Sequence, residues 1–301
     1  MTGPSRRDLL GRLVEGLVLA LVLPACRAGA RDATRRSPDM ALDQLMVTVD
    51  AVRAAQAPFA LQGRFSVRLE SPGSSGSTKG ALILHRPDRF RIELLTPLGT
   101  PLLYLASNGK ALHAWSQRDG RFYRGDDAGQ VLAQLTGGAV GLADVNALLT
   151  GMLPLPDAPI VSVDEDEQGM VRLSLQAPQD VRVLAILDPH ELITRELRVV
   201  RLDPGEDLPV QGMSDGVLTG GETLVEVRYA EVKRVGGNRL PEQILVSLPT
   251  LGWSLELEFL SWDELGQIPE VFELVPPAGA VEADLVATLR ELAEKQAAQG
   301  S

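Results

Sequence analysis

The chain has 301 residues, a formal net charge of −11 at pH 7 and 4% aromatic residues. Nucleic-acid binding and adhesion to anionic lipid both depend on Lys and Arg at phosphates, so this acidic composition argues against both, and no nucleic-acid partner is expected. The sequence contains one cysteine, which excludes a disulfide within the chain.

The first 25 residues have the layout of a bacterial export leader. A basic start with Arg6, Arg7 and Arg12 precedes a short apolar run over 16–23, which is far shorter than the roughly 20 residues that a membrane span needs. The run ends in Leu-Pro-Ala-Cys, the pattern of a lipoprotein cleavage site. The pattern predicts a signal peptide over 1–25 and a diacylglycerol on the thiol of Cys26.

Two alternatives concern this leader. Ser5 to Leu10 also resembles a twin-arginine export signal, so the export route stays open. The other alternative is that Cys26 is a core cysteine, but no neighbouring segment could form a core around it. We therefore expect a protein that is held on a membrane by the Cys26 lipid.

Residues 26–37 are polar, and we expect them to be a flexible tether between the lipid and the domain. Position 27 is Arg rather than the Asp that tends to retain lipoproteins of Gram-negative bacteria in the inner membrane. This favours the outer membrane, with the domain facing the periplasm.

The first helix is predicted to begin at Ser37-Pro38, because Ser is a good N-cap and Pro suits the first helical position. Apolar residues then recur at helical spacing, and they are Leu42, Leu45, Met46, Val49 and Val52.

From Phe65 the apolar residues alternate with polar ones, which predicts β-strands. Ser71 to Gly76 is rich in Gly and Ser, and it is predicted to be a turn. Asn108-Gly109 and Asp119-Gly120 are hairpin signals. The strands predicted around these turns are 64–70, 81–85, 89–94, 102–106, 112–115 and 121–124.

Two short helices are expected next, at 127–135 and 142–150, the second ending at Gly151. Strands then resume, and they are predicted at 170–176, 181–187, 193–202, 224–235, 243–248 and 253–261. The Gly-rich stretch 203–221 is predicted to be a surface loop. A last helix is expected from Val281, with Leu285, Leu289 and Leu292 on the same face.

The elements predict a mostly β protein with a few helices, an α+β fold. An antiparallel sheet of about 11 strands is too large to stay flat and must curl. The apolar stripes of the helices need a surface to cover, and the concave face of the curled sheet is the natural place.

Residues 90–156 resemble the LolB family of outer-membrane lipoprotein receptors. Leu94 to Thr100 resembles its strand, Pro-Leu-Gly turn and strand, and 131–137 resembles its helix ending in Leu-Thr-Gly. Residues 147–154 resemble the next helix, which ends in an apolar pair, Gly and Leu-Pro. The order and spacing of the three motifs agree with the family.

The resemblance implies an incomplete antiparallel barrel with a helical lid over an apolar cavity. It also implies that the protein accepts acyl chains of lipoproteins from a periplasmic carrier and inserts these lipoproteins into the outer membrane. No covalent chemistry, cofactor or metal belongs to that role, and a monomer is expected. The chain departs from the family in its length through 181–229 and in lacking an Asn that is common before Pro97.

The Pro-Leu-Gly turn is the sharpest candidate site. The turn should expose Leu98, flanked by Pro97 and Gly99 and preceded by Leu95. In the family a protruding loop here helps to place lipid into the membrane, and one Leu entering lipid contributes about 1.5–3 kcal/mol. The alternative is that Leu98 packs on its own sheet.

The resemblance also suggests a set of residues that line the acyl cavity, all expected on one face of the sheet. The alternative for this set is an ordinary core. The residues are Phe65, Val67, Phe90, Ile92, Leu94 and Tyr104.

Other chemistry has little support in the sequence. His85, His113 and His190 lack metal-ligand spacing, and there is no Gly-x-Ser-x-Gly motif or Gly-rich phosphate loop. The acidic run 164–167 is expected to be a solvated turn, with a calcium site as the alternative. No catalytic residue is proposed.

We therefore divide the chain into a signal peptide (1–25), a tether (26–37), a half-barrel lipid-binding domain (38–280) and a C-terminal helix and tail (281–301). Three rivals to a lipoprotein acceptor remain. They are an envelope lipid carrier or stress sensor with the same cavity, an envelope hydrolase, and a structural lipoprotein with a filled interior.

Overall fold

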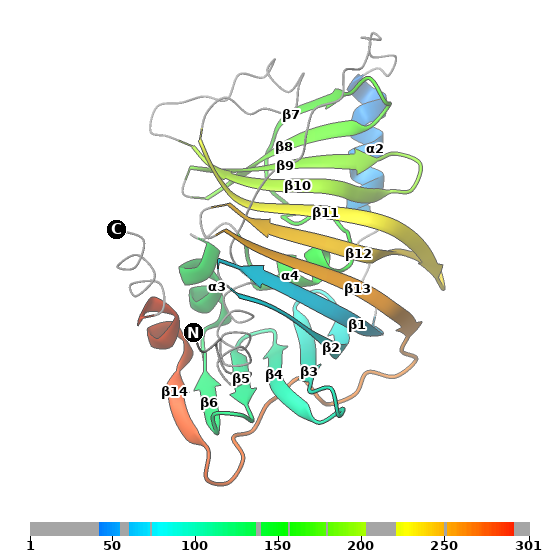
Figure 1. Ribbon diagram of the computed structural model, residues 1–301. Helices are drawn as coiled ribbons and strands as arrows, with labels where there is room; N and C mark the ends of the chain where they lie inside the picture. The colour runs from blue at the N-terminus through cyan, green and yellow to red at the C-terminus, as the bar shows by residue number, and fades with distance from the viewer. Residues whose placement is uncertain are drawn as a thin grey trace, which may run out of the picture.

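A single sheet of fourteen strands dominates the computed structural model (Figure 1). The residues that the structure describes are 42–54, 60–72, 74–136, 140–155, 157–178, 180–202, 221–249 and 252–291. The predicted leader, Cys26 and the tether lie outside them, and so does the predicted loop 203–221 except for its last residue.

The first half of the chain forms a meander of six strands that runs outward from β1. Its strands are β1 (Ala60–Ser71), β2 (Ser74–His85), β3 (Arg89–Leu95), β4 (Pro101–Asn108), β5 (Leu112–Ser116) and β6 (Arg121–Arg124). Each of these strands pairs antiparallel with the next.

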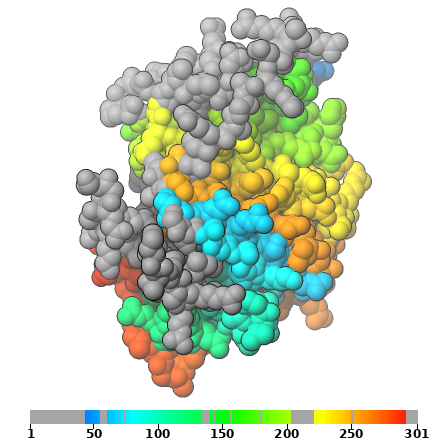
Figure 2. All heavy atoms as spheres, in the orientation of Figure 1, coloured from blue at the N-terminus to red at the C-terminus, as the bar shows by residue number. Residues whose placement is uncertain are grey.

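The second half forms a meander that runs inward and ends beside β1. Its strands are β7 (Ile160–Glu165), β8 (Val171–Ala177), β9 (Val181–Asp188), β10 (Ile193–Arg201), β11 (Glu222–Val235), β12 (Asn238–Leu248) and β13 (Trp253–Glu264). The antiparallel pairing of β1 with β13 joins the two meanders into one sheet. The space-filling view shows β1 in cyan against orange residues of β13 at the middle of this face (Figure 2).

The sheet is open and strongly twisted. Its edge strands are β7 and β14 (Val281–Asp284), and β14 pairs parallel with β6. The strands run across the view in β7–β13 and nearly up and down in β4–β6 and β14 (Figure 1). This change of direction is the right-handed twist between neighbouring strands, accumulated over the whole sheet.

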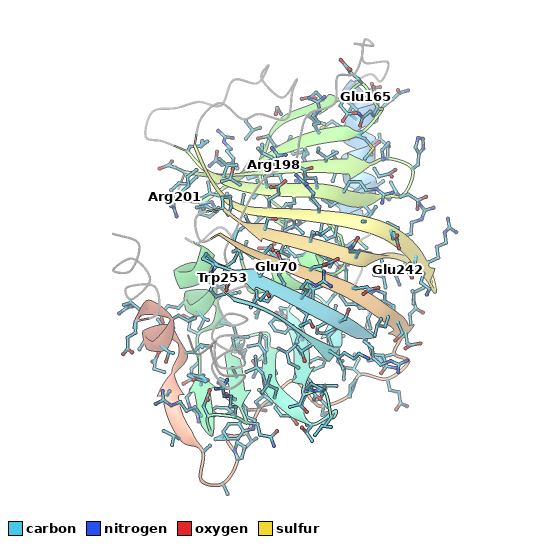
Figure 3. The ribbon with its side chains drawn as sticks, in the orientation of Figure 1. Glu70, Glu165, Arg198, Arg201, Glu242 and Trp253 are labelled. Carbon is cyan, nitrogen blue, oxygen red and sulfur yellow. The ribbon has the colours of Figure 1, made fainter. Side chains whose placement is uncertain are left out.

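Strict alternation gives the sheet two different faces. In β1, Phe65, Val67 and Leu69 are buried, while Arg64 and Arg68 are exposed. We call the face with the buried side chains the inner face and the opposite one the outer face. The outer face is charged, and Glu70 of β1 and Arg198 of β10 are among the side chains labelled on it in Figure 3.

Three helices cover the inner face. They are α2 (Leu42–Ala54), α3 (Ala128–Thr136) and α4 (Leu142–Leu149). Figure 1 shows α2 and α4 behind the sheet and α3 beside the left end of β1. Leu45, Val49, Val131 and Leu149 of these helices belong to the same buried cluster as the strand residues. The core therefore lies between the helices and the concave side of the sheet, as the apolar stripes predicted.

The fold class is confirmed, with differences in detail. The structure has fourteen strands in its described residues rather than about 11. The predicted turn 71–76 is mostly strand, because β1 extends to Ser71 and β2 begins at Ser74. Small polar residues on an exposed hairpin carry no apolar alternation, so periodicity could not reveal them.

Two further strands were missed. Strand β7 includes Asp164 and Glu165, which the sequence analysis placed in a solvated turn. Val281–Asp284 was expected to begin the last helix, but it forms β14, and helical structure begins at Leu285. A tetrapeptide has little local preference, and pairing with β6 decides its conformation.

Candidate functional site

The loop between β3 and β4 projects an apolar side chain into solvent. Leu98 has 92% of its surface exposed, and Pro97 and Gly99 beside it are exposed as well, while Leu95 at the base is half-buried. This is where the sequence analysis placed the candidate membrane-insertion residues.

The loop is held closed by hydrogen bonds within its own backbone and side chains. The N–H of Thr96 donates to the carbonyl of Thr100 at 2.7 Å, and the N–H of Gly99 donates to the carbonyl of Thr96 at 2.8 Å. The hydroxyl oxygens of Thr96 and Thr100 lie 2.6 Å apart. Gly99 has φ of 80°, a backbone conformation that residues with a side chain rarely adopt. The exposed Leu98 is therefore presented by a loop of defined shape.

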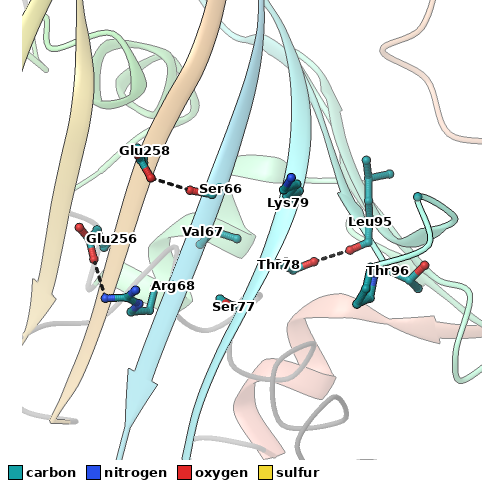
Figure 4. A pocket seen from close by; sticks show the side chains of 12 residues that line it. Ser66, Val67, Arg68, Ser77, Thr78, Lys79, Leu95, Thr96, Glu256 and Glu258 are labelled. Carbon is teal, nitrogen blue, oxygen red and sulfur yellow. Dashed lines mark hydrogen bonds and ion pairs between the residues drawn. The ribbon is translucent and has the colours of Figure 1, made fainter.

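A polar groove of about 480 Å³ lies on the outer face beside this loop. Ser66 and Arg68 of β1 face it, and they bond to Glu258 at 3.1 Å and to Glu256 at 3.6 Å across the β1–β13 junction (Figure 4). The hydroxyl of Thr78 donates to the carbonyl of Leu95 at the base of the loop. Charged and hydroxyl side chains line the groove together with apolar residues at the base of the loop, among them Leu95 and Pro97.

Five of the six predicted cavity residues lie together on the inner face. Their exposed fractions run from 1% to 6%, and they belong to the buried cluster that the helices cover. The five are Phe65, Val67, Phe90, Ile92 and Leu94. Their shared face is as expected, and their role in lining an acyl cavity stays a prediction.

Tyr104 is a correction to this set, because it lies on the outer face. It pairs with Glu93, and the guanidinium of Arg91 lies 5.0 Å from its ring centroid. Its neighbours Leu103 and Leu105 are the residues of β4 that point inward, opposite Leu94 and Ile92. The run 102–106 is apolar throughout, so alternation within β4 did not reveal which face each residue takes.

Helix α4 is fastened to the sheet by polar groups that the sequence analysis did not select. The side-chain amide of Asn146 donates to the carbonyls of Pro87 and Arg89 at 3.0 and 3.1 Å. Pro87 lies in the turn between β2 and β3 and Arg89 is the first residue of β3, so Asn146 holds the helix on that hairpin. A single Asn inside a short apolar helix was the signal that could have found it.

Asp144 of the same helix is buried and accepts two backbone hydrogen bonds. They come from the N–H of Gly141 at 2.7 Å and from the N–H of Leu155 at 2.6 Å. Burial raises the pKa of the Asp144 carboxyl, against the effect of these two bonds. The carboxyl thus joins the start of α4 to the segment that leaves it.

Neither a candidate metal site nor a membrane-spanning helix is found among the described residues. No group of three or more His, Cys, Asp or Glu in them could hold a metal ion. Asp166 instead closes the turn between β7 and β8 by accepting from the N–H groups of Gln168 and Met170. Within the described ranges, no helix has the length and apolar character that crossing a membrane requires.

Residues 57–185 match the family model described as the outer membrane lipoprotein LolB. This range begins just before β1 and ends within β9, so it holds the Leu98 loop, α3 and α4. The match confirms the resemblance to the LolB family that the motifs between 90 and 156 indicated.

Two curated relatives are outer-membrane lipoproteins LolB from two strains of Shewanella baltica. The one from strain OS155 is 28% identical over 132 residues, which are 44% of this chain and 58% of the relative. The one from strain OS223 is 32% identical over 123 residues, which are 41% of this chain and 53% of the relative. The chain thus spans little more than half the length of these relatives.

Solved structures share the fold. A LolA superfamily protein from Nitrosomonas europaea aligns with a TM-score of 0.50 and 12% identity over 76% of this chain and 97% of that protein. A DUF1329 family protein from Desulfovibrio piger aligns with a TM-score of 0.52 and 9% identity over 77% of this chain and 97% of that protein. At 9% and 12% identity, these alignments show a shared fold only. The open, curled sheet of this chain is consistent with the incomplete barrel that the sequence predicted.

Proposed function

We propose that this protein is a lipid-anchored acceptor of lipoproteins at the outer membrane, facing the periplasm. It would take the acyl chains of a lipoprotein from a periplasmic carrier and insert them into the membrane, without covalent chemistry. The main observation that supports the proposal is the Leu98 loop. Hydrogen bonds hold this loop closed, Leu98 is exposed on it, and it lies within the segment that matches the LolB family. The names of the Shewanella baltica relatives support the location.

In the first step of this proposal, a lipid on Cys26 keeps the domain at the membrane. Residues 26–37 would then allow the half-barrel to turn between the carrier and the bilayer. The acidic composition supports anchoring by acyl chains rather than by charge.

In the second step, the inner face accepts the acyl chains of the cargo. Each buried CH₂ contributes about 0.8 kcal/mol, so an aliphatic interior binds a long chain without directional contacts. Helices α3 and α4 cover this interior, and α4 is held by Asn146 and Asp144. We propose that α4 stays on the β2–β3 hairpin when the chains enter.

In the third step, Leu98 enters the lipid and brings the half-barrel to the bilayer surface. One buried Leu contributes about 1.5–3 kcal/mol, which suits a brief contact rather than permanent insertion. The hydrogen bonds that close the loop keep Leu98 exposed before contact, so little ordering is needed when it enters the membrane.

The test is transfer of a fluorescent triacylated lipoprotein from its periplasmic carrier to liposomes that contain the anchored protein. We expect the Leu98→Glu variant to take cargo from the carrier but to release it into the bilayer at least about tenfold more slowly, because a carboxylate does not enter hydrocarbon. Leu260→Glu is the matched control, since Leu260 is an exposed Leu (54%) on β13.

Equal transfer by the two variants would refute the role of the loop. If cargo never leaves the carrier even with the unchanged protein, the acceptor role is wrong for that cargo. The alternative of an envelope lipid carrier or stress sensor would then be preferred, and it predicts lipid binding without delivery to liposomes.

A further inference from the structure

Two hydroxyl groups are buried without a hydrogen-bond partner in the part of the chain that the structure describes. They are Oγ1 of Thr194 on β10 and Oη of Tyr229 on β11. Thr194 is 0% exposed and Tyr229 is 4% exposed. Buried polar groups in native proteins nearly always have a partner, so two such hydroxyls on adjacent strands call for an explanation.

Both side chains lie on the inner face. Thr194 pairs with Leu187 of β9, and Tyr229 pairs with Ile244 of β12. Leu187 and Ile244 are core residues, and residues directly opposite each other in a sheet share a face.

Thr194 and Tyr229 also lie at neighbouring positions along the paired strands β10 and β11. Arg228 pairs with Glu196, so Tyr229 is one residue beyond that pair and Thr194 is two residues before it in β10. Strands β10 and β11 run side by side in Figure 1. The backbones of the two residues therefore lie near each other on the inner face, and both side chains enter the same side of the sheet.

This region borders the segment that leaves α4. The backbone N–H of Thr194 donates to the carbonyl of Gly151 at 2.9 Å, and the side chain of Ile193 fills the space beside Gly151. Burial raises the pKa of Tyr229, so its hydroxyl keeps its proton and remains a donor.

We infer that Thr194 and Tyr229 form a binding point for the ester carbonyl oxygens of an acylated glyceryl group. The inference rests on the proposed function, which brings acyl chains to this face. A hydrocarbon chain has no polar atoms, whereas its ester linkage carries oxygens that accept hydrogen bonds and donate none. Two unpartnered O–H donors that lie opposite the core residues Leu187 and Ile244 are complementary to such a linkage.

The binding point would set how far the chains enter. The apolar residues of the interior can hold a chain at any depth, because hydrophobic contact is non-directional. Hydrogen bonds to the esters would stop the glyceryl group at β10 and β11, with the chains beyond it among the core residues.

The experiment compares two ligands that differ only in the carbonyls. The full chain is loaded with a fluorescent fatty-acid probe in a fixed detergent concentration. The probe is then displaced by one of two peptides. The first is a triacylated cysteine peptide, which has two ester-linked chains and one amide-linked chain. The second has the same chain lengths and the same amide-linked chain, but ether linkages replace the two esters. We expect the ester form to bind about tenfold more tightly.

Two conservative variants assign the preference to the two hydroxyls. Tyr229→Phe and Thr194→Val each remove one oxygen with little change of shape, and each is expected to reduce the ester preference severalfold while ether binding is retained. Tyr104→Phe makes the same change on the outer face, so it should leave the preference unchanged. A diester phospholipid and its diether analogue show whether the site also takes membrane glycerolipids.

The outcomes separate this inference from the proposed function. If ester and ether peptides displace the probe equally, the hydroxyls do not bind carbonyls, although acyl binding itself stands. If the preference survives in both variants, it arises elsewhere and the assignment is wrong. If neither peptide displaces the probe, the proposed function and this inference both fail.

Discussion

At the scale of single residues, close packing on the inner face requires a small residue opposite a large one. Gly80 of β2 pairs with Phe65 of β1, and a Cβ placed on Gly80 would lie 2.4 Å from Cζ of Phe65 and 2.7 Å from the carbonyl oxygen of Glu93. The ring of Phe65 occupies the space that a side chain at position 80 would need. Gly80 is thus required by packing, whereas Gly99 is required by its φ of 80°.

The variant Gly80→Ala tests this packing. We expect it to lower the free energy of unfolding by about 1–3 kcal/mol, because the added methyl group forces the ring and the backbone of β3 apart. Urea unfolding followed by circular dichroism measures the change. Gly266→Ala is the matched control, since a Cβ there meets nothing within 4 Å. Equal stability of the two variants would contradict the packing argument.

Whether a site residue could be predicted from the sequence depended on whether its immediate neighbours in the chain define its position. Leu98 was found because Pro and Gly flank it in a short loop, and the structure exposes it. Tyr104 was placed on the wrong face because its strand is apolar throughout 102–106. Nothing local distinguishes Thr194 and Tyr229 from other strand residues, so only the pairing of the strands revealed them.

At the scale of elements, polar side chains close the turns and fasten the helices. Asp188 at the end of β9 is an example. Its carboxylate accepts from the N–H groups of His190 and Glu191, both at 2.9 Å, and from Arg195 at 2.8 Å. Burial alone would raise the pKa of Asp188, but these bonds outweigh it and lower the pKa. The carboxylate therefore stabilises the β9–β10 hairpin in its charged form.

The pH dependence of this effect follows from the sign of the shift. Because the pKa of Asp188 is lower in the folded protein, its stabilisation is complete above the unfolded-state pKa of about 3.9 and is lost as the pH falls through the folded-state pKa. Asp188→Asn should cost about 1–3 kcal/mol at pH 7 and progressively less below about pH 4.

Urea unfolding of Asp188→Asn and of the unchanged protein between pH 7 and pH 3 measures this difference. Asp263→Asn is the control, because Asp263 is exposed on β13, and it should have little effect at any of these pH values. A deficit for Asp188→Asn that stays constant with pH would show that the charge of Asp188 is not the source of the stability.

At the scale of the whole molecule, the β1–β13 pairing decides whether the two meanders form one unit. The ladder runs from Leu61 opposite Glu264 to Glu70 opposite Ser254. On its inner side, Phe259 stacks on Trp262 at 4.2 Å and lies 5.8 Å from Phe65. Because this junction is both hydrogen-bonded and buried, we expect the halves to unfold together.

Tryptophan fluorescence can test this expectation, since Trp115 lies on β5 and Trp253 on β13. One variant keeps only Trp115 (Trp253→Phe with Trp262→Phe), and another keeps only Trp253 (Trp115→Phe with Trp262→Phe). In each variant, the urea midpoint from fluorescence should coincide with that from circular dichroism. Midpoints that differ within one variant would show that the meanders unfold separately.

The sequence by itself determined the features that depend on local patterns. Alternation predicted most strands and their buried faces, helical spacing predicted α2, and Gly and Pro predicted the Leu98 loop and the end of α4 at Gly151. The leader and Cys26 stay predictions of the same local kind, since they lie outside the described residues.

The tertiary structure alone decided what depends on contacts between distant segments. These are the junction of β1 with β13, the parallel pairing of Val281–Asp284 with β6, the outward position of Tyr104, and the bonds of Asn146 to the β2–β3 hairpin. Register and partner choice come from the summed packing of many residues far apart in the chain, so no short window of sequence contains them. The buried hydroxyls of Thr194 and Tyr229 belong to this second group, because only the assembled sheet brings the backbones of these residues near each other on its inner face.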